Sequence, residues 1–221
     1  DDDMDLKKAR ELELKYKGKQ REFHDIVMLG RQLYLITSFH NEAKKKNYLF
    51  RQKVHNTRLT TSERDLELIS EIDTRSTIRE GVFDIVQSKD SSKLLIYNKL
   101  PTKSREAEQF ALGVYDADFT QLWEKDITLP YDDRIFRVEE YRVDRAGNVY
   151  LLGVVFKDGT RDRRNGSPNY EYVILAYTNE GTLENEYRVS LVNVFITDLT
   201  FRVAKDGDLV CSGFYSDKGT Y

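Results

Sequence analysis

The sequence of 221 residues contains one cysteine, three prolines and no long apolar run. Because Cys211 is the only thiol, no disulfide can form within the chain, which excludes a small disulfide-stapled fold. No segment approaches the ~18 consecutive apolar residues that a membrane-spanning helix needs, and no secretory signal is visible. The net charge is −3, so the excess of positive charge that is typical of nucleic-acid-binding proteins is also lacking.

Tyr and Phe are abundant, with 14 and 11 residues, and both favour half-buried strands. Four segments share one order: a strand that ends in an apolar residue, a short turn rich in Gly, Asp or Ser, and a second apolar strand. They are Ile26–Ser38, Ile85–Asn98, Arg142–Phe156 and Arg202–Ser216. In the last two, Gly147 and Gly207 supply the positive φ that tight hairpin turns require.

A second set of hairpins lies between these turns, at Tyr48–Leu59, Phe110–Trp123 and Tyr172–Tyr187. A unit of four antiparallel strands therefore recurs about every 55 to 61 residues. One such unit cannot bury both of its faces, whereas several units stacked around an axis can. We therefore predict an all-β fold, a β-propeller or a large part of one, built from four-stranded antiparallel blades.

The predicted blades cover residues 23–72, 82–129 and 135–190, with a half blade at 195–215. Residues 11–16 alternate between charged and apolar side chains, which favours an outer strand of a preceding blade. A helix over residues 5–17 is the alternative, because Ala, Leu, Glu and Lys favour helices. We expect residues 1–221 to form one incomplete propeller domain within a larger chain or complex. A closed four-bladed ring is the rival arrangement.

The segment VDRAGNVYLLG resembles the repeat of bacterial β-propeller proteins of the cell envelope. In that repeat an apolar residue and Asp precede two variable residues, Gly-Asn, an apolar residue, Tyr, two apolar residues and Gly. The matching residues are Val143, Asp144, Gly147, Asn148, Val149, Tyr150 and Gly153. In the last copy Val203, Gly207, Leu209 and Gly213 match, while Asp208 and Val210 replace Asn and Tyr. The resemblance implies a propeller in the bacterial cell envelope, periplasmic or at the surface, and implies little about function.

The sequence shows no nucleophile elbow, phosphate-binding loop or dinucleotide fingerprint. We therefore predict no catalytic residue, no cofactor and no metal site. His24, His40 and His55 all fall in the first predicted blade, at positions that should not converge on one ion. Cys211 lies in the middle of an apolar strand and is predicted to be a buried thiol. Trp123 is predicted to pack between blades.

Three pairs of carboxylates are candidate catalytic groups, because glycoside hydrolysis needs two carboxyl groups that face each other across a substrate. The pairs are Asp116 with Asp118, Asp132 with Asp133, and Glu139 with Glu140. Glu139 and Glu140 are neighbours on a predicted strand, so their side chains point to opposite faces and cannot act on one substrate together. The other pairs are interpreted as turn and loop residues.

The loops that join second to third strands are basic. Residues 41–47, 98–108 and 157–169 together carry a net charge of +5, although the whole chain is acidic. In a propeller these loops share one face with the connections between blades. We predict that this face binds an acidic protein partner, which such charge asymmetry would attract and orient. The candidate residues are Lys44, Lys45, Lys46, Lys157, Arg161, Arg163 and Arg164. Simple solvation of long loops is the alternative.

The sequence thus favours a non-catalytic propeller that acts as a protein-interaction or scaffold module, with no nucleic-acid partner. One alternative is a carbohydrate-binding or hydrolytic propeller with its site at the central channel. The residues at blade entry that would line the channel are Asp25, Asp84, Arg137 and Asp198. A purely structural spacer is the other alternative.

Overall fold

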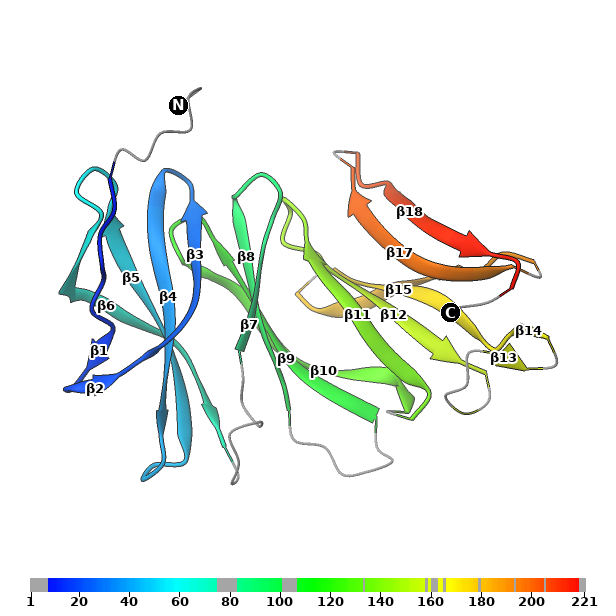
Figure 1. Ribbon diagram of the computed structural model, residues 1–221, viewed down its shortest axis with the longest axis horizontal. Coiled ribbons are helices and arrows are strands. Elements are labelled where there is room, and N and C mark those ends of the chain that lie inside the picture. Colours follow the sequence, from blue (N-terminus) through cyan, green and yellow to red (C-terminus); the bar gives the residue numbers. More distant parts are fainter. Residues whose placement is uncertain are drawn as a thin grey trace. The chain divides into compact units, whose positions relative to one another are not determined.

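The computed structural model describes residues 8–74, 83–100, 107–132, 134–157, 159, 163–164, 166–178, 180–192, 194–204 and 206–218 (Figure 1). For Arg163 and Arg164 it describes the backbone only. All regular structure in these residues is β-strand, and three of the sheets have four strands each. The predicted all-β class and the four-stranded antiparallel sheets are therefore confirmed. The chain divides into two compact units, Asp1–Phe83 and Asp84–Tyr221.

The first unit contains one four-stranded sheet in which each strand pairs antiparallel with its neighbour in sequence. The strands are β3 (Glu22–Leu29), β4 (Gln32–Asn41), β5 (Lys46–His55) and β6 (Thr60–Asp73). Of the outer strand predicted over residues 11–16, only β1 (Lys15–Tyr16) is a strand. It pairs with β2 (Lys19–Gln20) in a small hairpin around Gly18, whose φ is 77°.

The segment before β3 lies against one face of this sheet, which explains the alternation in its sequence. Leu12, Leu14 and Tyr16 are half-buried while their neighbours are exposed. The Tyr16 ring lies 5.3 Å from the ring of Phe39 and 4.8 Å from that of Phe50. An extended segment with one side on a sheet shows the same period of two as a paired strand, so periodicity alone could not separate the two.

Arg21 fixes this segment to the sheet. It is 2% exposed; its guanidinium donates to the Thr37 hydroxyl and, over 2.8 Å, to Oε1 of Gln52. Its Nε donates over 3.1 Å to the carbonyl oxygen of Lys15. Burial lowers the pKa of the guanidinium, an effect that the charge of Glu63 partly opposes. A buried cation held by neutral acceptors makes this contact sensitive to substitution.

The second unit contains two four-stranded sheets and a hairpin. The first sheet has β7 (Phe83–Gln87, whose first residue closes the first unit), β8 (Lys93–Lys99), β9 (Ala107–Asp116) and β10 (Gln121–Asp132). The second has β11 (Phe136–Val143), β12 (Val149–Phe156), β15 (Tyr170–Thr178) and β16 (Thr182–Val189). The hairpin is β17 (Phe195–Val203) with β18 (Leu209–Ser216). In the connection from β12 to β15, β13 (Arg163–Arg164) pairs with β14 (Ser167–Pro168).

Within the second unit, consecutive sheets pack face to face. One core joins the β7–β10 sheet to the β11–β16 sheet and includes Leu112, Leu151 and Leu175. Another joins the β11–β16 sheet to β17 and includes Leu152, Ile174 and Phe201. Because successive side chains of a strand point to opposite faces, β12 supplies both cores and is buried along its whole length.

In the β11–β12 turn, a hydrogen-bond network around Asp144 explains why Asp, Asn and Tyr occupy their positions in the repeated motif. One carboxylate oxygen accepts the backbone N–H of Asn148 at 2.9 Å, and the other accepts the side-chain amide of Asn148 at 2.9 Å and the Tyr150 hydroxyl at 3.2 Å. Gly147 has a φ of 90° in this turn and Gly207 has 95° in the later copy. That copy keeps the backbone bonds of the turn but lacks the network, since Ala204 stands where the first has Asp144.

The glycine that ends the motif permits a close approach of the neighbouring strand. A Cβ on Gly153 would collide with the Phe136 ring and lie 3.1 Å from the Arg137 carbonyl oxygen, and a Cβ on Gly213 would collide with the carbonyl oxygen of Asp198. Both approaches occur beside a β-bulge in the facing strand, between Val138 and Glu140 and between Ile196 and Asp198. In the first unit, β3 is the first strand of the four-stranded sheet, and it has a bulge as well, between Phe23 and Asp25. The irregularity therefore recurs with the repeat.

Candidate functional site

A pocket of about 270 Å³ lies where the connection from β12 to β15 meets the connection from β16 to β17. It belongs wholly to the second unit. Its lining is predominantly apolar, with a few polar and charged groups. The lining residues are Lys157, Ser167, Pro168, Tyr170, Glu171, Tyr172, Val189, Ser190, Leu191, Val192, Val194 and Ile196.

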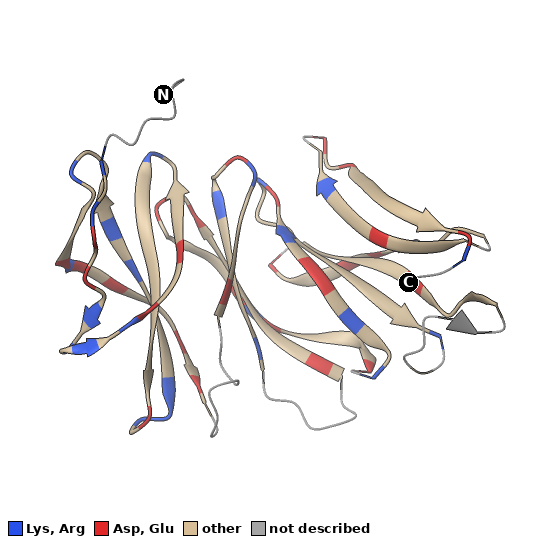
Figure 2. Cartoon of the chain, viewed as in Figure 1, with Lys and Arg blue, Asp and Glu red and all other residues tan. Residues whose placement is uncertain are grey.

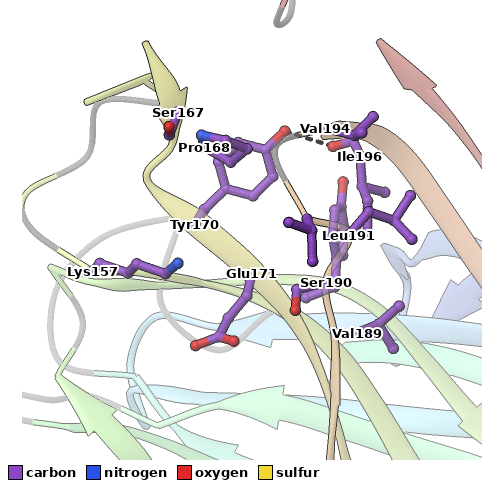
Figure 3. Close-up of a pocket in the computed structure, with 12 residues that line it drawn as sticks. Lys157, Ser167, Pro168, Tyr170, Glu171, Val189, Ser190, Leu191, Val194 and Ile196 are labelled. Carbon is purple, nitrogen blue, oxygen red and sulfur yellow. Dashed lines mark hydrogen bonds between the residues drawn. The ribbon is translucent and has the colours of Figure 1, made fainter. Parts of the chain in front are cut away.

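Two contacts shape this pocket, and Figure 3 shows the first of them, between Tyr170 and Ile196. Tyr170, the first residue of β15, is buried, and its hydroxyl donates a 2.6 Å hydrogen bond to the Ile196 carbonyl oxygen at the start of β17. The backbone N–H of Lys157 donates over 2.8 Å to the carbonyl oxygen of Asn169, which closes the base of the β12–β15 connection. The strand ends are therefore fixed, and the loops converge on the pocket.

The rim of the pocket exposes apolar side chains to solvent. Leu191 is 48% exposed and Val192 is 88% exposed. Both lie in the short connection between β16 and β17, where a bridge pairs Leu191 with Val194. Exposed apolar side chains beside a concave site are typical of a surface that a partner covers.

Among the described side chains that line the pocket, Lys157 is the cation, and no described residue forms an ion pair with it. Its side chain extends toward the space beside Tyr170 in Figure 3. The carboxylate of Glu171 accepts a 2.6 Å bond from Arg188, which also binds Glu186 and the hydroxyl of Tyr131. The negative charge at the pocket is thus neutralised, while the positive charge of Lys157 is available to a ligand.

Tyr172 connects the pocket to two of the predicted channel residues. Burial raises the pKa of its hydroxyl to about 12, with further contributions from Glu139, Tyr170 and Asp198, and the charge of Arg137 opposes them. Arg137 itself donates from Nε to Glu139 over 2.6 Å and lies 5.8 Å above the Phe156 ring. Charged groups of both signs therefore lie around one buried phenol.

The other two channel candidates, Asp25 and Asp84, lie on β3 and β7. Asp25 lies in the first unit, where its carboxylate accepts the neighbouring N–H of Ile26 at 2.7 Å. Asp84 lies on β7, where its charge adds to the burial that raises the pKa of Tyr97 to about 12. Within the second unit, Arg137 and Asp198 thus both act on the charge state of Tyr172, and Asp84 acts on that of Tyr97.

The basic residues predicted to bind an acidic partner differ in their surroundings. Lys46 is held by Glu71 over 2.5 Å and faces Asp73 at 3.6 Å, and its hydrogen bond to Glu71 raises its pKa. Lys44 and Lys45 are exposed and lie in the β4–β5 turn, which is blue in part in Figure 2. Arg161 lies outside the described residues, as do the side chains of Arg163 and Arg164. Of the candidate residues, Lys157 is the one that lines the pocket.

The paired carboxylates considered for catalysis take part in turns and ion pairs. No group of three His, Cys, Asp or Glu side chains in the described part of the chain is placed to hold a metal ion. Asp116 accepts the backbone N–H groups of Asp118 and Thr120 at 2.9 Å, as a turn residue does. Glu139 binds Arg137, whereas Glu140 binds Arg142 and accepts the hydroxyl of Thr200. Asp132 binds Arg134, and Asp133 lies outside the described residues.

Cys211 contradicts its prediction, because it is exposed. Its place in the second strand of a repeat suggested burial, yet β18 has a partner on one edge only, and no described strand covers the other. Partial desolvation by its neighbours nevertheless raises the pKa of the thiol. Trp123, in contrast, packs between sheets as predicted, since its Nε1 donates to Gly147.

Comparison with known protein families and with curated proteins finds no match for this chain. The described residues contain no helix long and apolar enough to cross a membrane. The pocket is therefore the feature of this chain that bears most directly on its function. Sequence reasoning found Lys157 but missed Tyr170, Leu191, Val192 and Ile196. The signal that could have found them is the apolar run from Leu191 to Ile196, placed where a polar inter-strand connection is usual.

Proposed function

We propose that this chain is a non-catalytic protein-interaction module, and that its pocket binds an apolar side chain of a partner protein next to an acidic group. The observation that carries the proposal is the pocket's combination of exposed Leu191 and Val192 with the ammonium of Lys157, which forms no ion pair with a described residue. An apolar anchor in a pocket, oriented by one charged contact, is the usual centre of a protein interface.

The size of the pocket supports a protein partner. Sites for drug-sized ligands enclose ~300–1,000 Å³, and this pocket, at about 270 Å³, is smaller. A single side chain fits such a space, and the exposed rim offers further contact area. The pairing of Glu171 with Arg188 leaves no free carboxylate in the pocket for acid–base chemistry.

The wider architecture is proposed to be a β-propeller of the repeat type that the sequence resembles. Face-to-face stacking of consecutive four-stranded sheets and the bulge repeated in their first strands support this proposal. A place in a bacterial cell envelope rests on the resemblance alone. In this arrangement the pocket lies on the face that carries the connections between blades.

A carbohydrate-binding site is the second candidate, and the group around Tyr172 favours it. Sugar ligands are bound by polar groups beside aromatic rings, and Arg137, Glu139 and Asp198 surround a phenol here. The 2.6 Å pairing of Arg137 with Glu139 satisfies both charges internally, which makes this candidate the weaker one.

The test is a pull-down of the full-length native protein with chemical cross-linking, compared among three variants. Val192→Glu places a charge on the apolar rim, and Lys157→Glu reverses the charge at the pocket. Lys89→Glu, in the exposed β7–β8 turn, is the matched control. We expect one partner to be lost with the two pocket variants and kept with the control. Equal recovery with all three, or a protein recovered alone, would overturn the proposal.

A further inference from the structure

The polar side chains that line the pocket offer a ligand mainly hydrogen-bond donors. Lys157, Ser167 and Ser190 all carry donors, and the side chain of Lys157 extends toward the pocket space in Figure 3. The carboxylate of Glu171 already accepts a 2.6 Å bond from Arg188. The polar part of a ligand that suits these groups is therefore a negatively charged acceptor, and a carboxylate has this chemistry.

The apolar part of the lining comes from both connections that meet at the pocket. Pro168 belongs to the connection from β12 to β15, and Val194 belongs to the connection from β16 to β17. The volume of about 270 Å³ gives room for a single side chain. The ligand must therefore bring an apolar side chain and a carboxylate close enough together to share one small pocket.

The end of a protein chain meets this requirement better than an internal segment does. Successive side chains of an extended chain point to opposite sides, so an internal Asp or Glu is directed away from the pocket that holds its apolar neighbour. The last residue of a chain, in contrast, carries its side chain and its carboxylate on the same Cα. Both groups can then enter one pocket without a bend in the ligand.

We propose that the occupant of the pocket is the C-terminal residue of a partner protein, and that Lys157 binds its carboxylate. The side chain of this residue is apolar and packs against Pro168 and Val194, while the hydroxyls of Ser167 and Ser190 are further donors in the lining. Capture of a terminal carboxylate is a recurring mode of peptide recognition. The inference rests on the function proposed above and specifies which part of the partner enters the pocket.

The test begins with a library of short random peptides that are displayed with free C-termini and selected on the full-length protein. The peptide that binds most tightly is then synthesised with a fluorescent label, once as the free acid and once as the C-terminal amide. Fluorescence anisotropy measures the binding of both. We expect the selected peptides to share an apolar last residue, and the amide to bind about tenfold or more weakly, because it lacks the charge that Lys157 binds.

Three protein variants locate the bound carboxylate. Lys157→Met removes the ammonium and is expected to weaken binding of the acid to the level of the amide, while binding of the amide stays unchanged. Lys89→Met, in the exposed β7–β8 turn, is the matched control and should leave both affinities unchanged. Val192→Glu places a charge on the rim of the pocket and should weaken both forms. Circular dichroism verifies that each variant is folded.

The outcomes separate this inference from the function on which it rests. An amide that binds as tightly as the acid, or a Lys157→Met protein that still distinguishes the two, would overturn the C-terminal occupant. Selected peptides that share an internal apolar residue beside Asp or Glu, whatever their last residue, would do the same. In these cases the proposed function stands if Val192→Glu weakens binding. A library that yields no binder, or binders that Val192→Glu does not affect, would overturn both.

Discussion

The indole Nε1 of Trp123 donates a 3.0 Å hydrogen bond to the carbonyl oxygen of Gly147. Trp123 lies on β10, the outer strand of one sheet, and Gly147 lies in the β11–β12 turn of the next sheet. The same ring lies beside the β15–β16 turn, where a Cβ on Gly181 would come within 3.1 Å of it. One side chain thus fixes the edge of one sheet against two turns of its neighbour.

Trp123→Phe should lower the free energy of unfolding by about 1 kcal/mol, because the Gly147 carbonyl loses its donor while most of the apolar contact remains. Urea denaturation followed by circular dichroism measures this. Leu122→Ala is the control, at a neighbouring residue that is 42% exposed. It should lower the free energy of unfolding by less than the ~2–5 kcal/mol that Leu→Ala costs at a buried position. A Trp123→Phe protein as stable as wild type would show that packing alone holds the two sheets.

The hydroxyls of Tyr141 and Tyr177 are buried and have no hydrogen-bond partner in the described structure. Removing an unsatisfied buried hydroxyl relieves a desolvation penalty, so Tyr141→Phe and Tyr177→Phe should leave stability unchanged or raise it by about 1 kcal/mol. Tyr170→Phe is the matched comparison, because its hydroxyl binds Ile196, and it should destabilise by about 1 kcal/mol. Thermal unfolding of the three variants gives the comparison; the reverse order would contradict it.

Stability should fall steeply in alkali. Burial is the first cause that raises the pKa to about 12 for Tyr97, Tyr115, Tyr131, Tyr150 and Tyr172. An unfolded tyrosine ionises near pH ~10, so above that pH the folded chain binds more protons than the unfolded one. Stability is then full below pH ~10 and is lost as the pH rises toward ~12.

Denaturation midpoints measured from about pH 8 to about pH 12, on both sides of the ordinary tyrosine pKa of ~10, test this linkage. The tyrosinate absorbance is followed in the same samples. The absorbance should rise together with unfolding rather than before it. A tyrosinate signal that titrates near pH ~10 in a protein that stays folded would contradict the burial of these phenols.

The residues Asp144, Asn148 and Tyr150 should act as one unit. Asp144→Ala should destabilise by about 1–2 kcal/mol, because three hydrogen bonds lose their acceptor. Once Asp144 is gone, Asn148→Asp and Tyr150→Phe should cost much less than they do in the intact turn, because the Tyr150 ring stays in the core and only its hydroxyl is removed. A double-mutant cycle in urea measures the coupling. Additive effects would mean that the turn is held by its backbone alone, as in the copy around Gly207.

The sequence predicted the sheets because turn chemistry and strand length are local properties. Gly147, Gly207 and the apolar alternation around them mark the hairpins, and repetition marks the four-stranded unit. Burial and pairing are not local. Cys211 is exposed because no strand among the described residues pairs with the second edge of β18. The segment around Tyr16 alternates because it lies on a sheet rather than within one.

The candidate site could be predicted only in part, for the same reason. Lys157 was found through the charge of its loop, but the charge of Lys46 is neutralised by Glu71, and that pairing depends on the register of β5 with β6. The mostly apolar segment 191–196 marks the connection that holds Leu191 and Val192 as unusual. The pocket itself forms where this connection meets the one from β12 to β15, and a contact between two distant segments cannot be found from a pattern along the chain.

The most direct test of the account places a photo-reactive residue at position 192, on the rim of the pocket, in the full-length protein within its own cells. The same residue at position 89, in the β7–β8 turn, is the control. We expect a cross-link from position 192 alone, to a partner peptide in which an apolar residue lies next to an acidic group. No cross-link from position 192, or the same products from both positions, would contradict it.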